Sequence, residues 1–191
     1  SGASDVEDAR AFLQDRVSLW AFWVFVLSFG FYVTNVVTVP LVRRTAPDFV
    51  DTALHAANLD HLAASFLFAT LWLLTRQLRF TLNTLRVLEL SSLIVGCTLF
   101  ALMGFYLTRL QVDAGLEAAF GAYAGLLACS HTVIARAITV PSVARRTLLG
   151  SVAAMTPLVP ATLLASVGSG ALTLNVATRC GVAIPLATVG S

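Results

Sequence analysis

The sequence predicts an all-α integral membrane protein, a bundle of six transmembrane helices preceded by a short N-terminal amphipathic helix. Of the 191 residues, 58% are hydrophobic and only 12% are charged, which is far more apolar than a soluble domain with a polar surface. The apolar residues fall into runs of about 20, the length that crosses a hydrocarbon core of ~30 Å. One membrane domain therefore accounts for nearly the whole chain.

The chain begins with an amphipathic stretch over residues 1–18, where Val6, Phe12, Leu13 and Val17 recur at helical spacing among charged residues. We expect this stretch to lie on the inner leaflet or against the bundle. The transmembrane domain over 19–189 divides into spans near 19–39, 55 or 61 to 75, 88–107, 116–135, 148–167 and 172–189. Residues 190–191 are interpreted as a linker or a cloning remnant.

The distribution of arginine predicts the orientation, because short cytoplasmic loops retain positive charge during insertion. All twelve basic residues are arginine. The side that holds the N-terminus carries Arg10, Arg16, Arg76, Arg79, Arg86, Arg136, Arg145 and Arg146, against Arg43, Arg44 and Arg109 on the other side. Both termini are therefore predicted to be cytoplasmic, with the lipid bilayer as the principal partner.

The composition argues against several kinds of chemistry. The chain has no lysine, so a Schiff base or a Walker-type phosphate loop has no candidate residue. Cys97, Cys129 and Cys180 stand singly inside apolar runs, which is typical of packing residues rather than of zinc, disulfide or thiol redox sites. With no nucleophile–base constellation and no nucleic-acid-binding face, we expect no catalytic residue, no cofactor and no nucleic-acid partner.

Three polar residues lie within the predicted spans. Arg179 is placed inside the sixth span, where an isolated charge costs ~2.5 kcal/mol or more, and Glu117 lies near the outer end of the fourth at a depth that could meet it. The pair is interpreted as a structural ion pair, or Arg179 as a snorkelling arginine, in preference to a sensing or ion-linked pair. His131, near the inner end of the fourth span, is interpreted as a hydrogen-bonded bundle residue rather than a proton relay.

Histidine and carboxylate also gather at the outer start of the second span, where His55, Asp60 and His61 follow Asp51. Such side chains ligate zinc or copper, but their spacing matches no established signature. They are weak candidates, and no metal site is predicted.

The fourth span contains the motif Gly121-Ala-Tyr-Ala-Gly125. Small residues at this spacing let two helix backbones approach closely. The motif suits packing within the bundle, which we favour, or a homodimer contact. Pro157 and Pro160 in the fifth span and Pro185 in the sixth are expected to kink those helices.

The most specific stretch is Arg136-Ala-Ile-Thr-Val-Pro-Ser142, closely followed by Arg145-Arg-Thr-Leu148. Shorter stretches accompany it: Arg10-Ala-Phe-Leu-Gln-Asp-Arg16, Leu27-Ser-Phe-Gly-Phe31, His61-Leu-Ala-Ala64, Trp72-Leu-Leu-Thr-Arg76, Ala101-Leu-Met-Gly104 and Pro185-Leu-Ala-Thr-Val189. Together they resemble the N-terminal multi-pass transmembrane region of bacterial receptor-type serine/threonine protein kinases.

The resemblance implies a membrane anchor and signal-input domain in a bacterial inner membrane, with a cytoplasmic kinase domain in cis beyond residue 191. The chain itself carries none of the kinase motifs, so it is not expected to be an enzyme. Arg136, Arg145 and Arg146 would lie on the cytoplasmic loop nearest the kinase, and we expect them to contact it or anionic lipid headgroups.

Two alternatives stay open: a small transporter or channel, and the membrane sensor domain of another signalling enzyme such as a nucleotide cyclase. An enclosed polar cavity around Arg179, Glu117 and His131 would favour transport. A dry centre packed by leucine and alanine would favour the anchor.

Overall fold

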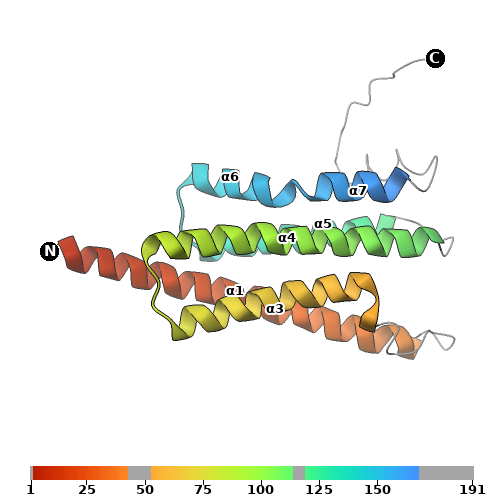
Figure 1. Ribbon diagram of the computed structural model, residues 1–191, viewed down its shortest axis with the longest axis horizontal. Coiled ribbons are helices and arrows are strands. Elements are labelled where there is room, and N and C mark those ends of the chain that lie inside the picture. Colours follow the sequence, from red (N-terminus) through yellow and green to blue (C-terminus); the bar gives the residue numbers. More distant parts are fainter. Residues whose placement is uncertain (1, 43–52, 114–118, 168–191) are drawn as a thin grey trace, which may run out of the picture.

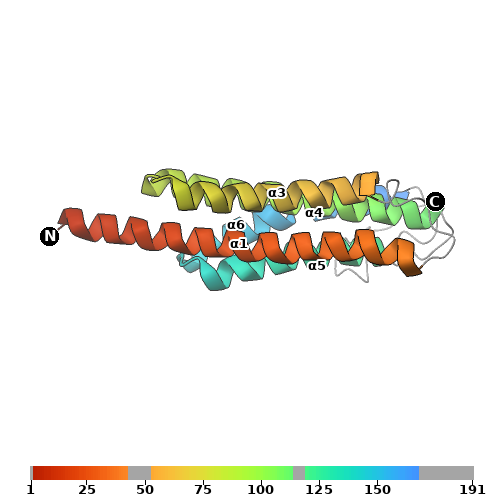
Figure 2. The same cartoon turned by 90° about the horizontal axis from the view of Figure 1, so that it is seen from below.

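The computed structural model describes residues 2–42, 53–113 and 119–167, and within these ranges it is helical without strands. The helices are α1 (Gly2–Val42), α3 (Ala56–Gln77), α4 (Leu82–Asp113), α5 (Ala119–Thr139), α6 (Ala144–Met155) and α7 (Leu158–Val167). They run along one common axis in three tiers, with α1 beside α3, α4 beside α5, and α6 in line with α7 (Figures 1 and 2). Helix α4 contacts all the others and is the central element.

Helix α1 joins the predicted amphipathic segment and the predicted first span into one helix of 41 residues. At 1.5 Å per residue it is about 60 Å long, twice the thickness of a hydrocarbon core of ~30 Å. Its N-terminal part projects beyond the ends of the other helices (Figure 2). Asp5, Glu7 and Asp8 lie in the first turns of α1 and are exposed, so these charges can stay in water while the rest of α1 crosses the membrane.

Within the described residues, four segments are long and apolar enough to cross a membrane: Asp5–Thr38, Ala56–Gln77, Leu82–Leu110 and Ala144–Ala165. They indicate a helical membrane protein. The prediction of six spans is not supported. Helix α5, which carries His131 and Arg136, is not among the four, and the predicted sixth span at 172–189 lies outside the described residues.

The predicted fifth span corresponds to α6 and α7, which a turn at Thr156 and Pro157 separates (Figure 1). A proline inside a helix lacks the backbone donor for the preceding turn and clashes with it. The helix restarts at once, because Ala161 N donates to Pro157 O at 3.2 Å. Proline therefore divides this segment into two short helices, whereas the sequence predicted a kink. Pro185 lies outside the described residues.

An apolar core holds the tiers together. The indole of Trp20 in α1 packs edge-on against Phe68 in α3, with ring centroids 5.3 Å apart, and both side chains are fully buried. Leu93 and Cys97 of α4 and Cys129 of α5 are also fully buried in this core cluster. The centre of the described bundle is thus packed by apolar side chains.

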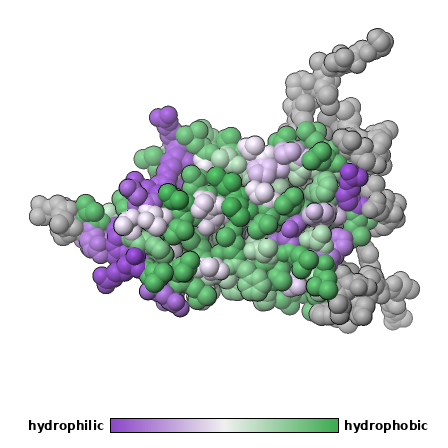
Figure 3. All heavy atoms as spheres, in the orientation of Figure 1, coloured by the Kyte–Doolittle hydropathy of each residue, from purple (hydrophilic) through white to green (hydrophobic). Residues whose placement is uncertain are grey.

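The antiparallel order of the helices brings the start of α1, the end of α3, the start of α4, the end of α5 and the start of α6 to one end of the bundle (Figure 1). We call it the N-terminal end. The eight arginines that the sequence assigns to one side lie on these helix ends and the turn between α3 and α4. Hydrophilic side chains accordingly gather at this end, and hydrophobic ones cover the middle of the visible face (Figure 3).

Candidate ligand cavity and buried ion cluster

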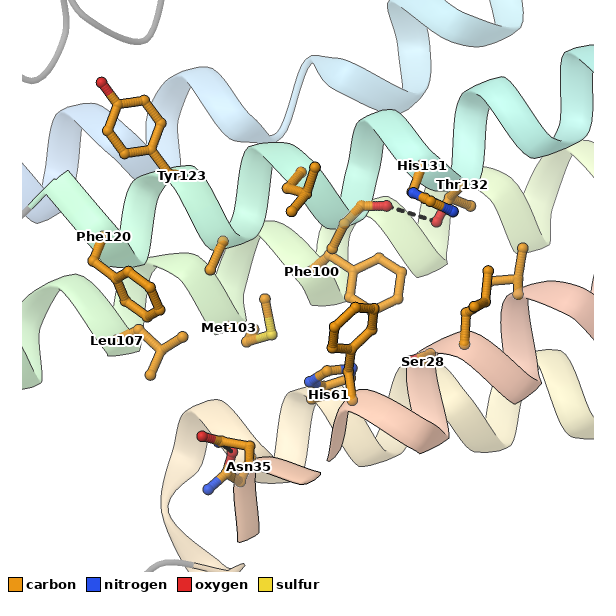
Figure 4. Close-up of a pocket in the computed structure, with 17 residues that line it drawn as sticks. Ser28, Asn35, His61, Phe100, Met103, Leu107, Phe120, Tyr123, His131 and Thr132 are labelled. Carbon is orange, nitrogen blue, oxygen red and sulfur yellow. Dashed lines mark hydrogen bonds between the residues drawn. The ribbon is translucent and has the colours of Figure 1, made fainter. Parts of the chain in front are cut away.

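A cavity of about 540 Å³ lies between α1 and α5, and residues of α3 and α4 form its inner wall. We call it the α1–α5 cavity. Most of its lining is apolar, including Phe100, Met103 and Leu107 of α4, which project from one side of that helix (Figure 4). The residues on its lining with polar side-chain atoms are Ser28, Asn35, Asn58, His61, Tyr123, His131 and Thr132.

A hydrogen bond joins α1 and α5 on the side of the cavity toward the N-terminal end. There the indole Nε1 of Trp20 donates to the backbone oxygen of Thr132 at 3.3 Å. Farther along, the lining includes four large side chains that the bundle leaves exposed: Leu27 (38%), Phe31 (65%), Phe120 (66%) and Leu127 (65%). Since these apolar side chains face the surroundings of the bundle, the cavity opens sideways toward the lipid.

The polar groups of the inner wall are hydrogen-bonded to one another across α1 and α3. The hydroxyls of Ser28 and Ser65 are 2.7 Å apart, and the Ser65 hydroxyl lies 3.0 Å from the backbone oxygen of His61, one turn earlier in α3. Nearer the other end of the cavity, Asn35 Nδ2 donates to Asn58 Oδ1 at 2.8 Å. Buried polar groups paired in this way fix the α1–α3 contact and still offer a ligand a few hydrogen-bonding atoms.

An aromatic contact holds His61 in place. Its ring packs edge-on against Phe100 of α4, with centroids 5.8 Å apart, and against Tyr32 of α1 at 6.4 Å. Figure 4 shows His61 and Phe100 close together, with Ser28 nearby. An apolar volume of several hundred Å³ with a small number of polar groups on one wall is typical of small-molecule sites between bundle helices.

The other predicted intramembrane polar residues do not form a polar centre in the described structure. His131 is exposed on α5, at the edge of the α1–α5 cavity. Arg179 and Glu117 lie outside the described residues, so their predicted pairing stays a prediction.

The weak metal candidates do not come together. The Nδ1 atom of His55 accepts from Ala57 N at 3.3 Å and caps the start of α3, whereas His61 lines the α1–α5 cavity. Asp60 has a buried Oδ2 without a hydrogen-bond partner among the described groups. Among the residues that the structure describes, no group of three or more His, Cys, Asp or Glu side chains could hold a metal ion.

Gly121 and Gly125 lie at the contact between α5 and α4. A Cβ atom on Gly121 would come within 2.4 Å of the backbone nitrogen of Thr108, and one on Gly125 within 3.1 Å of Phe100 O. Gly104 of α4 faces both, since its own Cβ would meet Gly121 O at 3.0 Å. The glycine motif therefore packs within the bundle, which is the one of the two predicted roles that we favoured over a homodimer contact.

A buried ion cluster joins α4, α5 and α6 at the N-terminal end. Glu89 of α4 is 0% exposed; its Oε1 accepts from Arg136 Nε at 2.7 Å and its Oε2 from Arg146 Nη2 at 2.8 Å. The guanidinium of Arg136 is 1% exposed and lies beneath Gly150 of α6, where an added Cβ would be 3.8 Å from its Nη1. Breaking such a pair is costly because the remaining charge stays buried.

This cluster corrects the prediction for Arg136, one of the three arginines that the sequence placed on a cytoplasmic loop. Arg136 lies inside α5 and is buried against Glu89, so it cannot contact a kinase domain or a lipid headgroup. Arg146 lies in the first turn of α6 and is partly buried in the same cluster. Only Arg145 is exposed. The reason is Glu89, which offers two carboxylate oxygens in an apolar setting.

The sequence pattern did not single out Glu89, although it is the one carboxylate within the predicted span at 88–107. A carboxylate inside a span is expensive unless it is paired. Glu89 lies at the same end of the bundle as eight arginines. This shared position could have indicated that Glu89 pairs with an arginine.

Comparison with known protein families, curated proteins and solved structures finds no match for the chain.

Proposed function

We propose that this chain is the membrane anchor and signal-input domain of a bacterial serine/threonine protein kinase, with both termini on the cytoplasmic side. The observation that carries the input role is the α1–α5 cavity, a lateral opening of about 540 Å³ in a bundle whose described centre is otherwise packed by apolar side chains. The link to a kinase rests on the sequence resemblance. The N-terminal amphipathic half of α1 would lie at the cytoplasmic face.

The cavity supports an apolar or amphipathic signal molecule that enters from the bilayer. Its opening carries exposed Leu27, Phe31 and Leu127, which suit lipid rather than water. Its wall offers the paired amides of Asn35 and Asn58 for a polar head. A ligand with an apolar body and one or two hydrogen-bonding groups would satisfy both parts of the lining.

Helix α5 provides a route from the cavity to the cytoplasmic end. One face of α5 lines the cavity, and its last turn carries Arg136, which shares Glu89 with Arg146 of α6. A ligand that binds better when α5 stands away from α1 would shift the bundle toward that arrangement. The ion cluster would then pass the displacement of α5 on to α6.

The alternative of a transporter or channel has less support. Trp20, Phe68 and Leu93 are fully buried at the centre of the described bundle, and the buried charges that it holds lie together in the Glu89 cluster at one end. A dry centre favours the anchor. A nucleotide cyclase as the output domain would use the same input mechanism.

The first test is to read the coding sequence downstream of residue 191 in the source gene. We expect an open frame that encodes a serine/threonine kinase domain. A stop codon would overturn the anchor proposal, and a cyclase domain would replace the kinase while keeping the input role.

The second test measures autophosphorylation of the full-length protein in vesicles made from membrane lipid extracts and from a single pure phosphatidylcholine. We expect activity to differ between the two vesicle types for the unmodified protein. Ala128→Leu, which narrows the cavity, should reduce that difference, whereas Ala137→Leu on the exposed side of α5 should keep it. Equal responses of both variants would remove the cavity from the mechanism.

A further inference from the structure

A second hollow lies at the N-terminal end, apart from the α1–α5 cavity. It measures about 260 Å³ and is lined by residues of α1, of the end of α3 and of the turn that follows: Arg10, Gln14, Asp15, Arg76, Leu78 and Arg79 among them. We call it the arginine hollow. In contrast to the first cavity, its lining is dominated by charged and amide side chains.

The side chain of Gln14 builds the floor of the arginine hollow. Its Nε2 donates to the backbone oxygens of Thr75 at 2.7 Å and Leu78 at 2.8 Å, and its Oε1 accepts from Phe80 N at 3.4 Å. These bonds fasten α1 to the end of α3, where backbone carbonyls have no partner within the helix. The hollow is thus a fixed feature of the α1–α3 junction rather than a chance gap between mobile side chains.

The arginines of the arginine hollow differ in the hydrogen bonds that they make. Arg10 is engaged, since it donates to both carboxylate oxygens of Glu7, at 2.9 and 2.6 Å, and to Gln14. Arg76 and Arg79 are exposed, and no described residue accepts a hydrogen bond from either guanidinium. Three arginines therefore face Asp15 on the lining and Glu7 behind it, which leaves an excess of one positive charge and two unused guanidinium forks.

The hollow lies where the apolar surface of α3 ends. The candidate span of α3 closes at Gln77, and next to Arg76 are three exposed leucines, Leu73 (45%), Leu74 (36%) and Leu78 (49%). Apolar surface beside two neighbouring arginines at the end of a span can bind a molecule that has acyl chains and an anionic headgroup. Guanidinium forks bind phosphate oxygens bidentately, and basic pockets between membrane helices bind anionic headgroups.

We propose that the arginine hollow binds the phosphate of an anionic phospholipid, with Arg76 and Arg79 on the phosphate oxygens and the acyl chains along Leu73, Leu74 and Leu78. Bound there, the lipid bridges the projecting part of α1 and the turn between α3 and α4. The inference concerns this junction alone and holds whatever domain follows the chain.

The test is a titration of the purified full chain in neutral detergent, followed by native mass spectrometry, with phosphatidylglycerol and with phosphatidylcholine of the same acyl composition. We expect one phosphatidylglycerol to bind in preference to phosphatidylcholine. The double variant Arg76→Gln/Arg79→Gln should bind phosphatidylglycerol about 30-fold more weakly, because each arginine near an anionic headgroup contributes a several-fold gain in affinity. Arg76→Lys/Arg79→Lys should retain part of the affinity.

The matched control is Arg145→Gln, which removes an exposed arginine of α6 at the same end but outside the hollow. It should leave the affinity unchanged. Equal binding of the two lipids by the unmodified chain, or an equal loss in the control and the double variant, would overturn the proposal. Displacement of the lipid by inorganic phosphate at equal concentration would reassign the hollow to a free phosphate. Unchanged circular dichroism verifies that the variants fold.

Discussion

Helix α5 has two sides that differ in how they meet their neighbours. Toward α4 the backbones approach closely, since a Cβ on Gly121 would clash with the backbone of Thr108 and one on Gly125 would be only 3.1 Å from Phe100 O. The buried Glu89–Arg136 pair adds a contact at the N-terminal end. Toward α1 the helices meet near Trp20 and then leave the α1–α5 cavity. One helix thus has a fixed side and an open side.

The difference has a cause in side-chain size. Glycines on the α4 side permit backbone contact, which in a membrane is a main source of helix association because lipid is as apolar as leucine. On the α1 side, Phe120, Tyr123 and Leu127 point into the cavity lining or the lipid instead of interdigitating. The face of α5 toward α4 therefore stabilises the bundle, and the face toward α1 leaves space for a ligand.

The largest effect is expected from Glu89→Gln, which breaks the fixed side. The substitution keeps the volume but leaves the Arg136 guanidinium buried without an anion, and loss of one partner of a buried pair costs about 3–5 kcal/mol. The midpoint of unfolding by sodium dodecyl sulfate, starting from mild detergent, should fall strongly. The control Glu7→Gln, in an exposed pair, should have no measurable effect.

A rescue variant sharpens this prediction. Replacing both partners in Glu89→Gln/Arg136→Met removes the unpaired charge, so it should recover most of the lost stability. If Glu89→Gln alone unfolds at the same point as the unmodified chain, the cluster does not hold α4, α5 and α6 together.

A smaller loss of stability is expected from Gly121→Ala, which also lies on the side of α5 that faces α4. The new methyl group would lie 2.4 Å from the backbone nitrogen of Thr108, and backbone cannot rotate away as a side chain can. Overpacking of this kind costs about 1–3 kcal/mol, measured by the same unfolding titration. Gly30→Ala is the matched control, because its Cβ would meet nothing within 4 Å. It should be neutral or stabilise the helix by up to about 1 kcal/mol. Equal losses in the two variants would contradict the close contact.

The smallest effect on stability is expected from a substitution on the open side of α5, which faces α1. Ala128→Leu places a side chain in the α1–α5 cavity, so stability should change by less than about 1 kcal/mol, since the space is already empty of protein. Labelling should change instead. A photoactivatable diazirine fatty acid is expected to cross-link to residues of α1 and α5 around the cavity in the unmodified chain, and peptide mass spectrometry should show this labelling reduced in Ala128→Leu.

Ala137→Leu, on the exposed side of the same helix, should be labelled like the unmodified chain. Labelling spread evenly over all lipid-facing helices, and unaffected by Ala128→Leu, would mean that the α1–α5 cavity is no more than part of the lipid surface.

Much of the helical fold was predictable from apolar runs of membrane length. The end of α3 came within two residues of the predicted second span, whereas α4 extends six residues beyond the predicted third span at each end, and the proline-rich segment broke near Pro157. The number of spans was less predictable: α5, which carries His131 and Arg136, is not among the four described segments that are long and apolar enough to cross a membrane. Local patterns also could not tell that α1 would run without interruption from Gly2 to Val42.

The site was predictable only in part. His131 was predicted to be a polar residue within a span, and His61 was singled out only as a weak metal candidate. Both line the cavity, but residues from four helices form it, and no single run of the sequence reveals how they come together. Glu89 was overlooked because its meaning depends on Arg136, 47 positions away along the chain.

The sequence by itself determined that the chain is helical, that it carries several membrane-length segments and that its arginines gather on one side, because these follow from local hydropathy and charge. Only the tertiary structure decided which arginines are free and which are buried, that the glycine motif packs internally, and that α1 and α5 leave a cavity. Those outcomes depend on which helix faces which, and packing between distant segments is what a linear pattern does not specify.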